Sequence, residues 1–270
     1  MGDEQMSTVS IITYHGLSLP KNEADENGYN IPVEDFERQI RWLKEKGYVN
    51  ASFTSYLHDR RVTAEQGKKV LITFDDGEKS NFTHACPLLE QYGYLAVLFI
   101  TTGIVQTNRE FLSWHQVKQL SDRGHVIQSH GHTHRFLSSM EDEEIFCELR
   151  LSRDLIERYT GKRPEAFSCP GGRYDRRVMR IARELGYRKM FTSRPMSALF
   201  LQQGYAAGRT MIHQGMGDSA FAAGVRGDAW YLLSQNVTYM MKGIARSFVG
   251  ENRYQQLFNM YHLWRSMGKK

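Results

Sequence analysis

Apolar residues follow two different patterns along this chain. Short runs rich in Val, Ile, Leu and Phe are typical of buried strands; they cover residues 9–14, 70–74, 95–101, 125–130, 166–169, 188–192 and 208–212. Between them, apolar residues return every three or four positions, as on one face of a helix; these stretches cover residues 32–47, 86–93, 114–123, 140–159 and 176–185. The alternation of about seven strand–helix units predicts a parallel α/β fold, either a barrel or a doubly wound sheet.

Chemically active side chains gather where the predicted strands end. Asp75 and Asp76 directly follow one apolar run, His130 ends another, and Gly171 comes just after a third. In parallel α/β proteins, catalytic groups collect at the carboxyl ends of the strands, where loops vary without disturbing the core. This regularity favours a distorted (β/α)7-type barrel, similar to a TIM barrel, with one active face.

The pattern changes to helix without strands from about residue 216 onward. An apolar stripe at helical spacing follows near the end of the chain: Tyr254, Leu257, Phe258, Tyr261 and Trp264. We expect this helix to pack its stripe on the barrel rather than to bind a membrane surface or a partner. The sequence therefore predicts two parts, a barrel over residues 1–215 and a helical C-terminal extension over residues 216–270 that packs on it.

Composition adds few constraints. The net charge is +5 and the pI about 9.0, but the 35 Lys and Arg residues are scattered, so no nucleic-acid partner is expected. The 3 cysteines include no CxxC pair, which gives no indication of a disulfide framework or a Cys-type zinc site. Neither a signal peptide nor an apolar stretch of about 20 residues is visible. As given, the chain is expected to be cytoplasmic and not associated with a membrane.

The spacing of His130 and His134 indicates a metal site. Residues four apart on a helical turn project the same way, so both imidazoles can reach one cation, and a carboxylate from another strand would complete a three-ligand site with an open position. Alone, the Asp75-Asp76 pair would suit a turn or a helix start, and the two His could be spaced by chance. Together they favour a mononuclear metal hydrolase.

The motifs that carry these groups resemble those of the polysaccharide deacetylases, the NodB-homology group or carbohydrate esterase family 4. Residues 73–77 (TFDDG) look like the family's first motif and residues 129–137 (SHGHTHRFL) like its second. Residues 95–101 and 111–114 match the intervening run, and residues 12–16 (ITYHG) are similar to the start of the subgroup acting on exopolysaccharides. The resemblance covers about residues 9–213 and leaves the C-terminal helices unexplained.

This resemblance implies a metal-dependent hydrolase that removes N-acetyl groups from an N-acetylated sugar or polysaccharide. Asp76, His130 and His134 would hold one divalent ion, for which zinc is the first expectation and cobalt, manganese or nickel are alternatives. Asp75 would be the base that takes a proton from the attacking water. The backbone N–H of Gly171 would help the metal to stabilise the oxyanion.

The chain departs from the family pattern in its later motifs. Ser168 and Gly171 occupy the third motif where the family carries an Arg and a Tyr, and no fourth motif with Asp and Trp is evident. Arg209 is therefore predicted to approach Asp75 from a different strand. His213 is the candidate for the late His that acts as general acid in the family.

Three residues are further candidates for contact with the substrate: His15, Arg209 and Trp114. His15 could equally be a hydrogen-bonded residue in the barrel mouth without a catalytic role. If His213 is not the acid, that role would go to Asp75 or to His15. Aromatic residues such as Trp114 near helix starts are more often core than sugar-stacking. Two other functions stay open: hydrolysis of another linear or cyclic amide or a formamide on the same scaffold, and glycan binding by a catalytically weakened protein.

Overall fold

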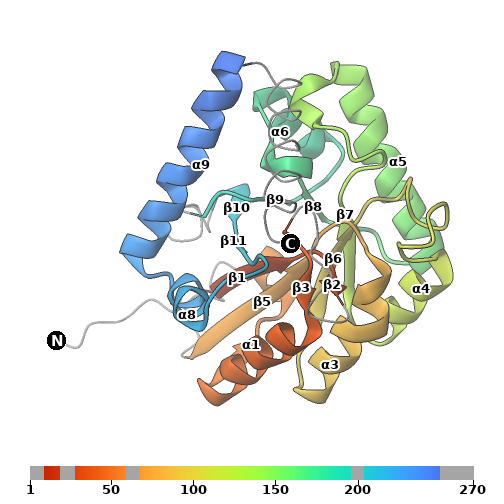
Figure 1. Cartoon of the computed structure of the whole chain (residues 1–270). Coiled ribbons are helices and arrows are strands. Elements are labelled where there is room, and N and C mark those ends of the chain that lie inside the picture. Colours follow the sequence, from red (N-terminus) through yellow and green to blue (C-terminus); the bar gives the residue numbers. More distant parts are fainter. Residues whose placement is uncertain (1–8, 19–27, 59–66, 196–203, 250–270) are drawn as a thin grey trace, which may run out of the picture.

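The computed structural model describes residues 9–18, 28–58, 67–195 and 204–249 (Figure 1). Its main sheet is entirely parallel. Along the sheet, the strands are β10 (Ala206–Gly208), β9 (Lys189–Thr192), β8 (Ala166–Ser168), β7 (Val126–Ser129), β6 (Ala96–Ile100), β5 (Lys68–Phe74), β1 (Val9–Tyr14) and β11 (Thr210–Met211). A short strand, β4 (Tyr48–Asn50), pairs with the start of β5, and β2 (Leu17–Ser18) pairs with β3 (Ile31–Pro32) separately.

The two ends of this strand order belong to one interrupted segment. β10 pairs with β9 and β11 pairs with β1, and only Arg209 separates the two short strands. The segment thus joins both edges of the sheet and closes it into a barrel. With β10 and β11 taken as one strand, the barrel has the seven strands of the predicted (β/α)7-type fold, which is confirmed.

Helices surround the barrel (Figure 1). They are α1 (Val33–Glu45), α2 (Phe53–His58), the π-helical turn η2 (Asn81–Ala85) leading into α3 (Cys86–Gln91), α4 (Trp114–Asp122), η3 (Leu137–Ser139), α5 (Asp142–Thr160), η4 (Pro170–Gly172) and α6 (Arg176–Glu184). The glycine after α5, Gly161, adopts the left-handed conformation that commonly ends a helix. Strand residues that face these helices, such as Ile72 and Leu98, are fully buried with helix residues such as Phe36 and Leu120.

A second apolar cluster fills the barrel interior. Its residues alternate along each strand with those that face the helices, because successive side chains of a strand point to opposite faces of the sheet. Inward residues include Val9 and Ile11 of β1, Leu71 of β5 and Phe99 of β6, and Phe53 of α2 packs against them. The interior is therefore a packed core at one end, and only the opposite end is available for a site.

Among the described residues, two helices follow the barrel, α8 (Asp218–Arg226) and α9 (Ala229–Val249). Phe221 and Val225 of α8 are buried in the outer core, and Phe221 meets Trp42 of α1 edge to face at 5.5 Å between ring centroids. In contrast, Trp230 at the start of α9 is 84% exposed. The predicted stripe over residues 254–264 lies outside the described residues, so the division at residue 215 stays a prediction. No helix in the described ranges is long and apolar enough to cross a membrane.

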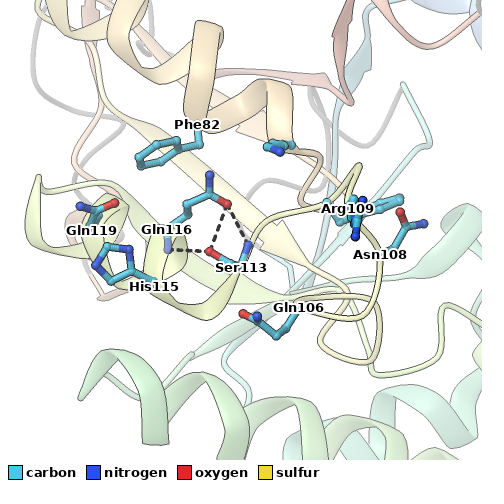
Figure 2. A pocket seen from close by; sticks show the side chains of 10 residues that line it. Phe82, Gln106, Asn108, Arg109, Ser113, His115, Gln116 and Gln119 are labelled. Atoms are coloured by element: carbon cyan, nitrogen blue, oxygen red, sulfur yellow. Dashed lines mark hydrogen bonds between the residues drawn. The ribbon is translucent and has the colours of Figure 1, made fainter.

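A hollow of about 500 Å³ opens on the outside of the barrel (Figure 2). Lys79 and Phe82, from the connection after β5 and from η2, form one wall. Arg109 and Phe111, from the connection between β6 and α4, form another, and the first turns of α4 complete it. The hollow lies beside the segment that follows Asp76 rather than over it.

Candidate active site

Every second residue of a strand faces the barrel interior, and this pattern continues past the carboxyl ends of the strands, where the inward residues are polar. On β5 the inward series Leu71 and Thr73 leads to Asp75, and on β1 the series Ile11 and Thr13 leads to His15. The same step of two residues leads from other inward positions to His130, Ser168 and Arg209. One interior layer at the mouth of the barrel therefore collects groups from five strands.

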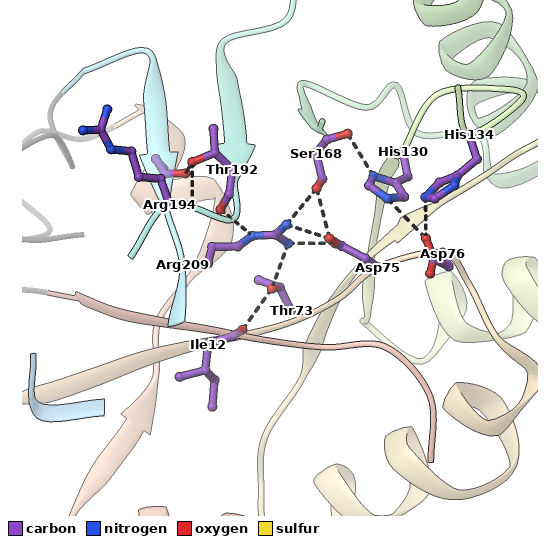
Figure 3. Close-up of polar contacts among 11 residues, drawn as sticks. Ile12, Thr73, Asp75, Asp76, His130, His134, Ser168, Thr192, Arg194 and Arg209 are labelled. Atoms are coloured by element: carbon purple, nitrogen blue, oxygen red, sulfur yellow. Dashed lines mark hydrogen bonds and ion pairs between the residues drawn. The ribbon is translucent and has the colours of Figure 1, made fainter. Parts of the chain in front are cut away.

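Asp75 and Arg209 form a bidentate ion pair inside this layer (Figure 3). Nη1 of Arg209 donates to Oδ1 of Asp75 at 2.7 Å, and Nη2 donates to Oδ2 at 2.6 Å. Burial alone would raise the pKa of Asp75, but the charges of Arg209 and His130 and the hydrogen bonds from Arg209 outweigh it, and this pKa lies below its usual value. Asp75 is thus held ionised with a fixed orientation.

The guanidinium of Arg209 has further partners on three strands. It donates to Oγ of Ser168 at 2.8 Å, to Oγ1 of Thr73 at 3.3 Å and to the carbonyl of Thr192 at 3.3 Å. Its side chain has 0% exposure. Arg209 therefore offers no exposed surface for the substrate contact suggested from the sequence, whereas its approach to Asp75 from a different strand is seen directly.

Asp76 leaves the alternation through a sharp turn. Its φ is +70°, in the left-handed region that few residues other than glycine adopt. Gly77 follows with φ +86°, and a Cβ on it would lie 3.0 Å from Cγ2 of Ile100. Because the chain turns here, Asp76 points to the barrel mouth beside Asp75 instead of to the opposite face.

Three ligand atoms converge at the mouth. Nε2 of His130 lies 3.2 Å and Nε2 of His134 lies 3.1 Å from Oδ1 of Asp76, and the three atoms lie within 4.8 Å of one another (Figure 3). Nδ1 of His130 donates to the carbonyl of Ser168 at 2.9 Å, so in the neutral imidazole Nε2 presents a lone pair. Oδ1 of Asp76 is buried and accepts no hydrogen bond in the described part of the chain. Two imidazole nitrogens and a carboxylate oxygen that converge in this way are a donor set that fits a cation.

The electrostatics of the triad agree with this fit. Burial alone would raise the pKa of Asp76, but the close imidazoles of His130 and His134 outweigh it and hold this pKa well below its usual value. Burial alone would lower the pKa of His130, but Asp75 and Asp76 outweigh it and this pKa is raised. The site therefore favours positive charge at the point that a metal ion would occupy.

A buried glutamate holds the loop between the two histidines. Glu148 of α5 accepts hydrogen bonds from the backbone N–H of His132 at 2.8 Å, from that of Thr133 at 2.9 Å and from Oγ1 of Thr133 at 2.6 Å. Glu148 is only 8% exposed. His134 directly follows this loop with φ +63°. Glu148 is not among the site residues predicted from the sequence, although its position between Ile145 and Ser152 on the apolar face of a helix is a usable signal, because acidic residues are rarely buried without a partner.

His132, between the two triad histidines, is directed elsewhere. Its Nδ1 lies 3.0 Å from Oγ1 of Thr102, and Gly103 N–H donates to its carbonyl at 2.8 Å. It therefore ties the second-motif loop to the loop after β6 rather than joining the triad.

His15 lies beside the two carboxylates. Its ring stacks on Tyr29 with centroids 4.6 Å apart, and its carbonyl accepts from Nδ2 of Asn81 at 2.7 Å. Burial lowers the pKa of His15, while the nearby charges of Asp76 and Asp75 oppose that shift. Nδ1 is buried and has no hydrogen-bond partner among the described residues. An imidazole with an unpaired nitrogen thus borders the site.

His213 and Trp114 are not brought to this layer by their described contacts. His213 is exposed after β11, and its Nδ1 donates to the carbonyl of Gln214 at 3.0 Å. Trp114 stacks on Tyr159 of α5, with ring centroids 4.2 Å apart and planes 10° from parallel. Trp114 therefore packs between two helices of the outer layer, which removes the motivation for a sugar-stacking role.

Gly171 forms a tight contact at the rim. Its φ is +61°, and a Cβ there would lie 2.6 Å from Cε1 of Phe136. The guanidinium of Arg173 covers the same Phe136 ring, 3.8 Å from its centroid. Only glycine fits this approach, but the oxyanion role of its N–H stays a prediction.

Comparisons with known proteins agree with the fold and the motifs. The polysaccharide deacetylase family model matches residues 63–190. YxkH of Bacillus subtilis (strain 168), whose name places it among polysaccharide deacetylases, is 30% identical over 225 residues, which cover 82% of this chain and 77% of that protein. A peptidoglycan-N-acetylglucosamine deacetylase of Bacillus cereus is 32% identical over 127 residues, 47% of this chain and 57% of its own length.

A solved structure shows the same fold. The Streptococcus pyogenes deacetylase PplD, determined in complex with acetate, superposes with a TM-score of 0.68 at 23% identity, covering 78% of this chain and 94% of that one. The barrel, the order of the motifs and the similarity to YxkH over most of both chains lead to one assignment. This chain belongs to the polysaccharide deacetylase family.

Proposed function

We propose that this chain is a metal-dependent hydrolase that removes N-acetyl groups from a glycan. The observation that carries the proposal is the convergence of Asp76, His130 and His134 beside Asp75, a buried carboxylate with a fixed orientation. Family membership supports the reaction class, a hydrolysis of a carbon–nitrogen bond outside peptides. The name of the Bacillus cereus relative supports an N-acetylated sugar as the substrate.

Zinc is the metal that the donor set fits best. Two imidazole nitrogens and one carboxylate oxygen, with a position left open, are typical of catalytic zinc, although cobalt, manganese and nickel accept the same ligands. When bound, such an ion would acidify a water molecule and polarise the amide carbonyl.

Asp75 is the base in this proposal. One oxygen of its carboxylate takes a proton from the water as that water attacks the carbonyl carbon of the acetamide. Arg209 and Ser168 keep the carboxylate ionised and oriented through their hydrogen bonds. The N–H of Gly171 donates to the oxygen of the tetrahedral intermediate.

His15 is better placed than His213 to be the proton donor. Collapse of the intermediate breaks the C–N bond and requires a proton on the leaving nitrogen, because an amine anion is a very poor leaving group. Nδ1 of His15 is unpaired in the described structure and its ring lies near both carboxylates, whereas His213 is exposed and bonded to its neighbour's carbonyl. The acid role predicted for His213 thus receives no support from its position.

Acetate release from N-acetylglucosamine oligomers tests the proposal. We expect the zinc-loaded protein to release acetate, a chelator to abolish the release, and added zinc to restore it. His15→Ala should cut turnover while keeping metal content, and His213→Ala serves as its matched control. Oligomer binding without acetate release would indicate a glycan-binding protein instead. Release of ammonia or formate from other amides alone would indicate the alternative hydrolase.

A further inference from the structure

The hollow beside η2 carries positive charge without a counter-charge. Lys79 and Arg109 line it, and the 10 lining residues include no carboxylate. Figure 2 shows Arg109 on one side of this hollow. Neither cation has an ion pair within the described ranges of the chain. By contrast, Arg123 nearby pairs with Glu90 at 2.6 Å. Two like charges that face one concavity raise the local concentration of anions.

The walls of the hollow are held by hydrogen bonds that do not use these cations. Ser113 Oγ accepts from Gln116 N–H at 3.2 Å, and Gln116 Oε1 accepts from Ser113 N–H at 2.9 Å. The backbone N–H of Lys79 donates to the carbonyl of Glu110 at 2.8 Å. The frame is therefore fixed by the backbone and by a helix cap, while the Lys79 and Arg109 side chains are left to bind something else.

The chemistry of the remaining wall suits a sugar. Phe82 and Phe111 provide apolar surface, and the side-chain amides of Gln116 and Gln119 can donate to hydroxyl or acidic oxygens. Arg109 can bind a carboxylate or phosphate through two parallel hydrogen bonds, and Lys79 adds a point charge.

The hollow also adjoins the metal triad. Lys79 follows Asp76 by three residues, so their Cα atoms are at most about 11 Å apart. The N–H of Leu112, next to Phe111, donates to the carbonyl of Gly77 at 3.0 Å. The hollow is therefore within the length of a few sugar units from the triad.

We propose that this hollow binds an anionic group, a carboxylate or a phosphate, on a sugar unit near the one that is deacetylated. The proposal rests on the proposed function and makes it more specific, because the preferred substrate becomes an acidic glycan. Lys79 and Arg109 then determine specificity and take no part in the chemical step.

Kinetics on matched oligosaccharides test this inference. The probes are a neutral N-acetylglucosamine oligomer, an oligomer of equal length with alternating glucuronate, and one that carries phosphate. We expect the double variant Lys79→Gln/Arg109→Gln to raise KM for the acidic probes about tenfold relative to the neutral one, with kcat unchanged. The control Arg150→Gln/Arg158→Gln removes the same charge from the outer face of α5 and should leave this ratio as in the wild type.

An equal change of KM for neutral and acidic probes, or no change, would overturn the inference while leaving the deacetylase assignment intact. Calorimetric measurement of the binding of the same probes tests the hollow independently of the proposed deacetylase function. If no probe releases acetate, the proposed function falls. Loss of acidic-probe binding in the Lys79/Arg109 variant but not in the control would then still support the hollow as an anion site, and retained binding would reject it.

Discussion

Asp75 and Asp76 are adjacent in the sequence, yet their carboxylates have opposite surroundings. Asp75 is paired with a buried arginine and also accepts from Ser168 at 3.2 Å. Asp76 faces two imidazole nitrogens, and its buried Oδ1 has no hydrogen bond among the described residues. One carboxylate is satisfied by the protein itself, and the other keeps an oxygen that a cation could bind. The backbone turn at Asp76 creates this difference between two identical side chains.

The largest effect should come from Asp75→Asn. The amide cannot take the proton of the attacking water, so turnover should fall by about 100- to 10,000-fold. Metal content, measured by elemental analysis, should stay at the wild-type level because Asp75 lies outside the triad. Loss of metal in this variant would show that the two carboxylates share one role.

Arg209→Met should be the most destabilising change. It leaves Asp75 buried without its partner, which typically costs about 3–5 kcal/mol in the free energy of unfolding. Urea unfolding measures this loss. The matched control is Arg188→Met, because Arg188 pairs with Glu165 at 2.7 Å on the surface, where such pairs contribute about 1 kcal/mol or less. Similar losses of unfolding free energy in both variants would mean that the buried ion pair contributes no more to stability than a surface pair.

Asp76→Asn should remove the stabilisation that zinc confers. Asn tolerates the left-handed backbone at this position, so the fold should persist. With zinc at 100 times its Kd, the wild type should gain about 2.7 kcal/mol in the free energy of unfolding. The variant should gain little, and Asp75→Asn should gain as much as the wild type. A zinc-dependent gain that survives in Asp76→Asn would exclude this carboxylate as a ligand.

Glu148→Gln should have the smallest effect. The amide keeps one acceptor oxygen but replaces the other with a donor, so it cannot accept all the bonds that the loop of His134 offers. We expect zinc affinity, measured by competition with a chelating dye, to fall about tenfold. Activity should return at saturating zinc, as expected for a positioning residue. Glu143→Gln, an exposed change on the same helix, is the control.

The sequence was sufficient to predict the long elements and the site motifs. Strands such as β5 and β6 form apolar runs with clear boundaries, and the Asp and His motifs lie directly at strand ends. The apolar run 208–212 predicts one strand, but the structure has two, which begin at Ala206 and are separated by Arg209. The difference matters because β10 pairs with β9 and β11 pairs with β1, so the divided segment connects the two edges of the sheet.

Other features depend on tertiary contacts that no local pattern contains. β4 has three residues and α2 has six, which is too few for either periodicity to be visible. The relation of Glu148 to the loop at His132 exists only once α5 packs beside β7. The choice between His15 and His213 likewise depends on which imidazole the closed barrel turns inward, and both follow strands in the sequence.

The closure of the barrel by the Arg209 segment links the proposed activity to the order of chain synthesis. Asp75 and Arg209 are 134 residues apart, so the proposed base stays without this partner until the ribosome has released nearly the whole barrel. A long-range contact of this kind forms late and slowly, since a large loop must close first. The proposed metal ligands, the last of which is His134, are therefore synthesised well before the residue that orients the proposed base. If these roles hold, we expect hydrolysis only after the final strand is inserted, so that activity would report completed folding.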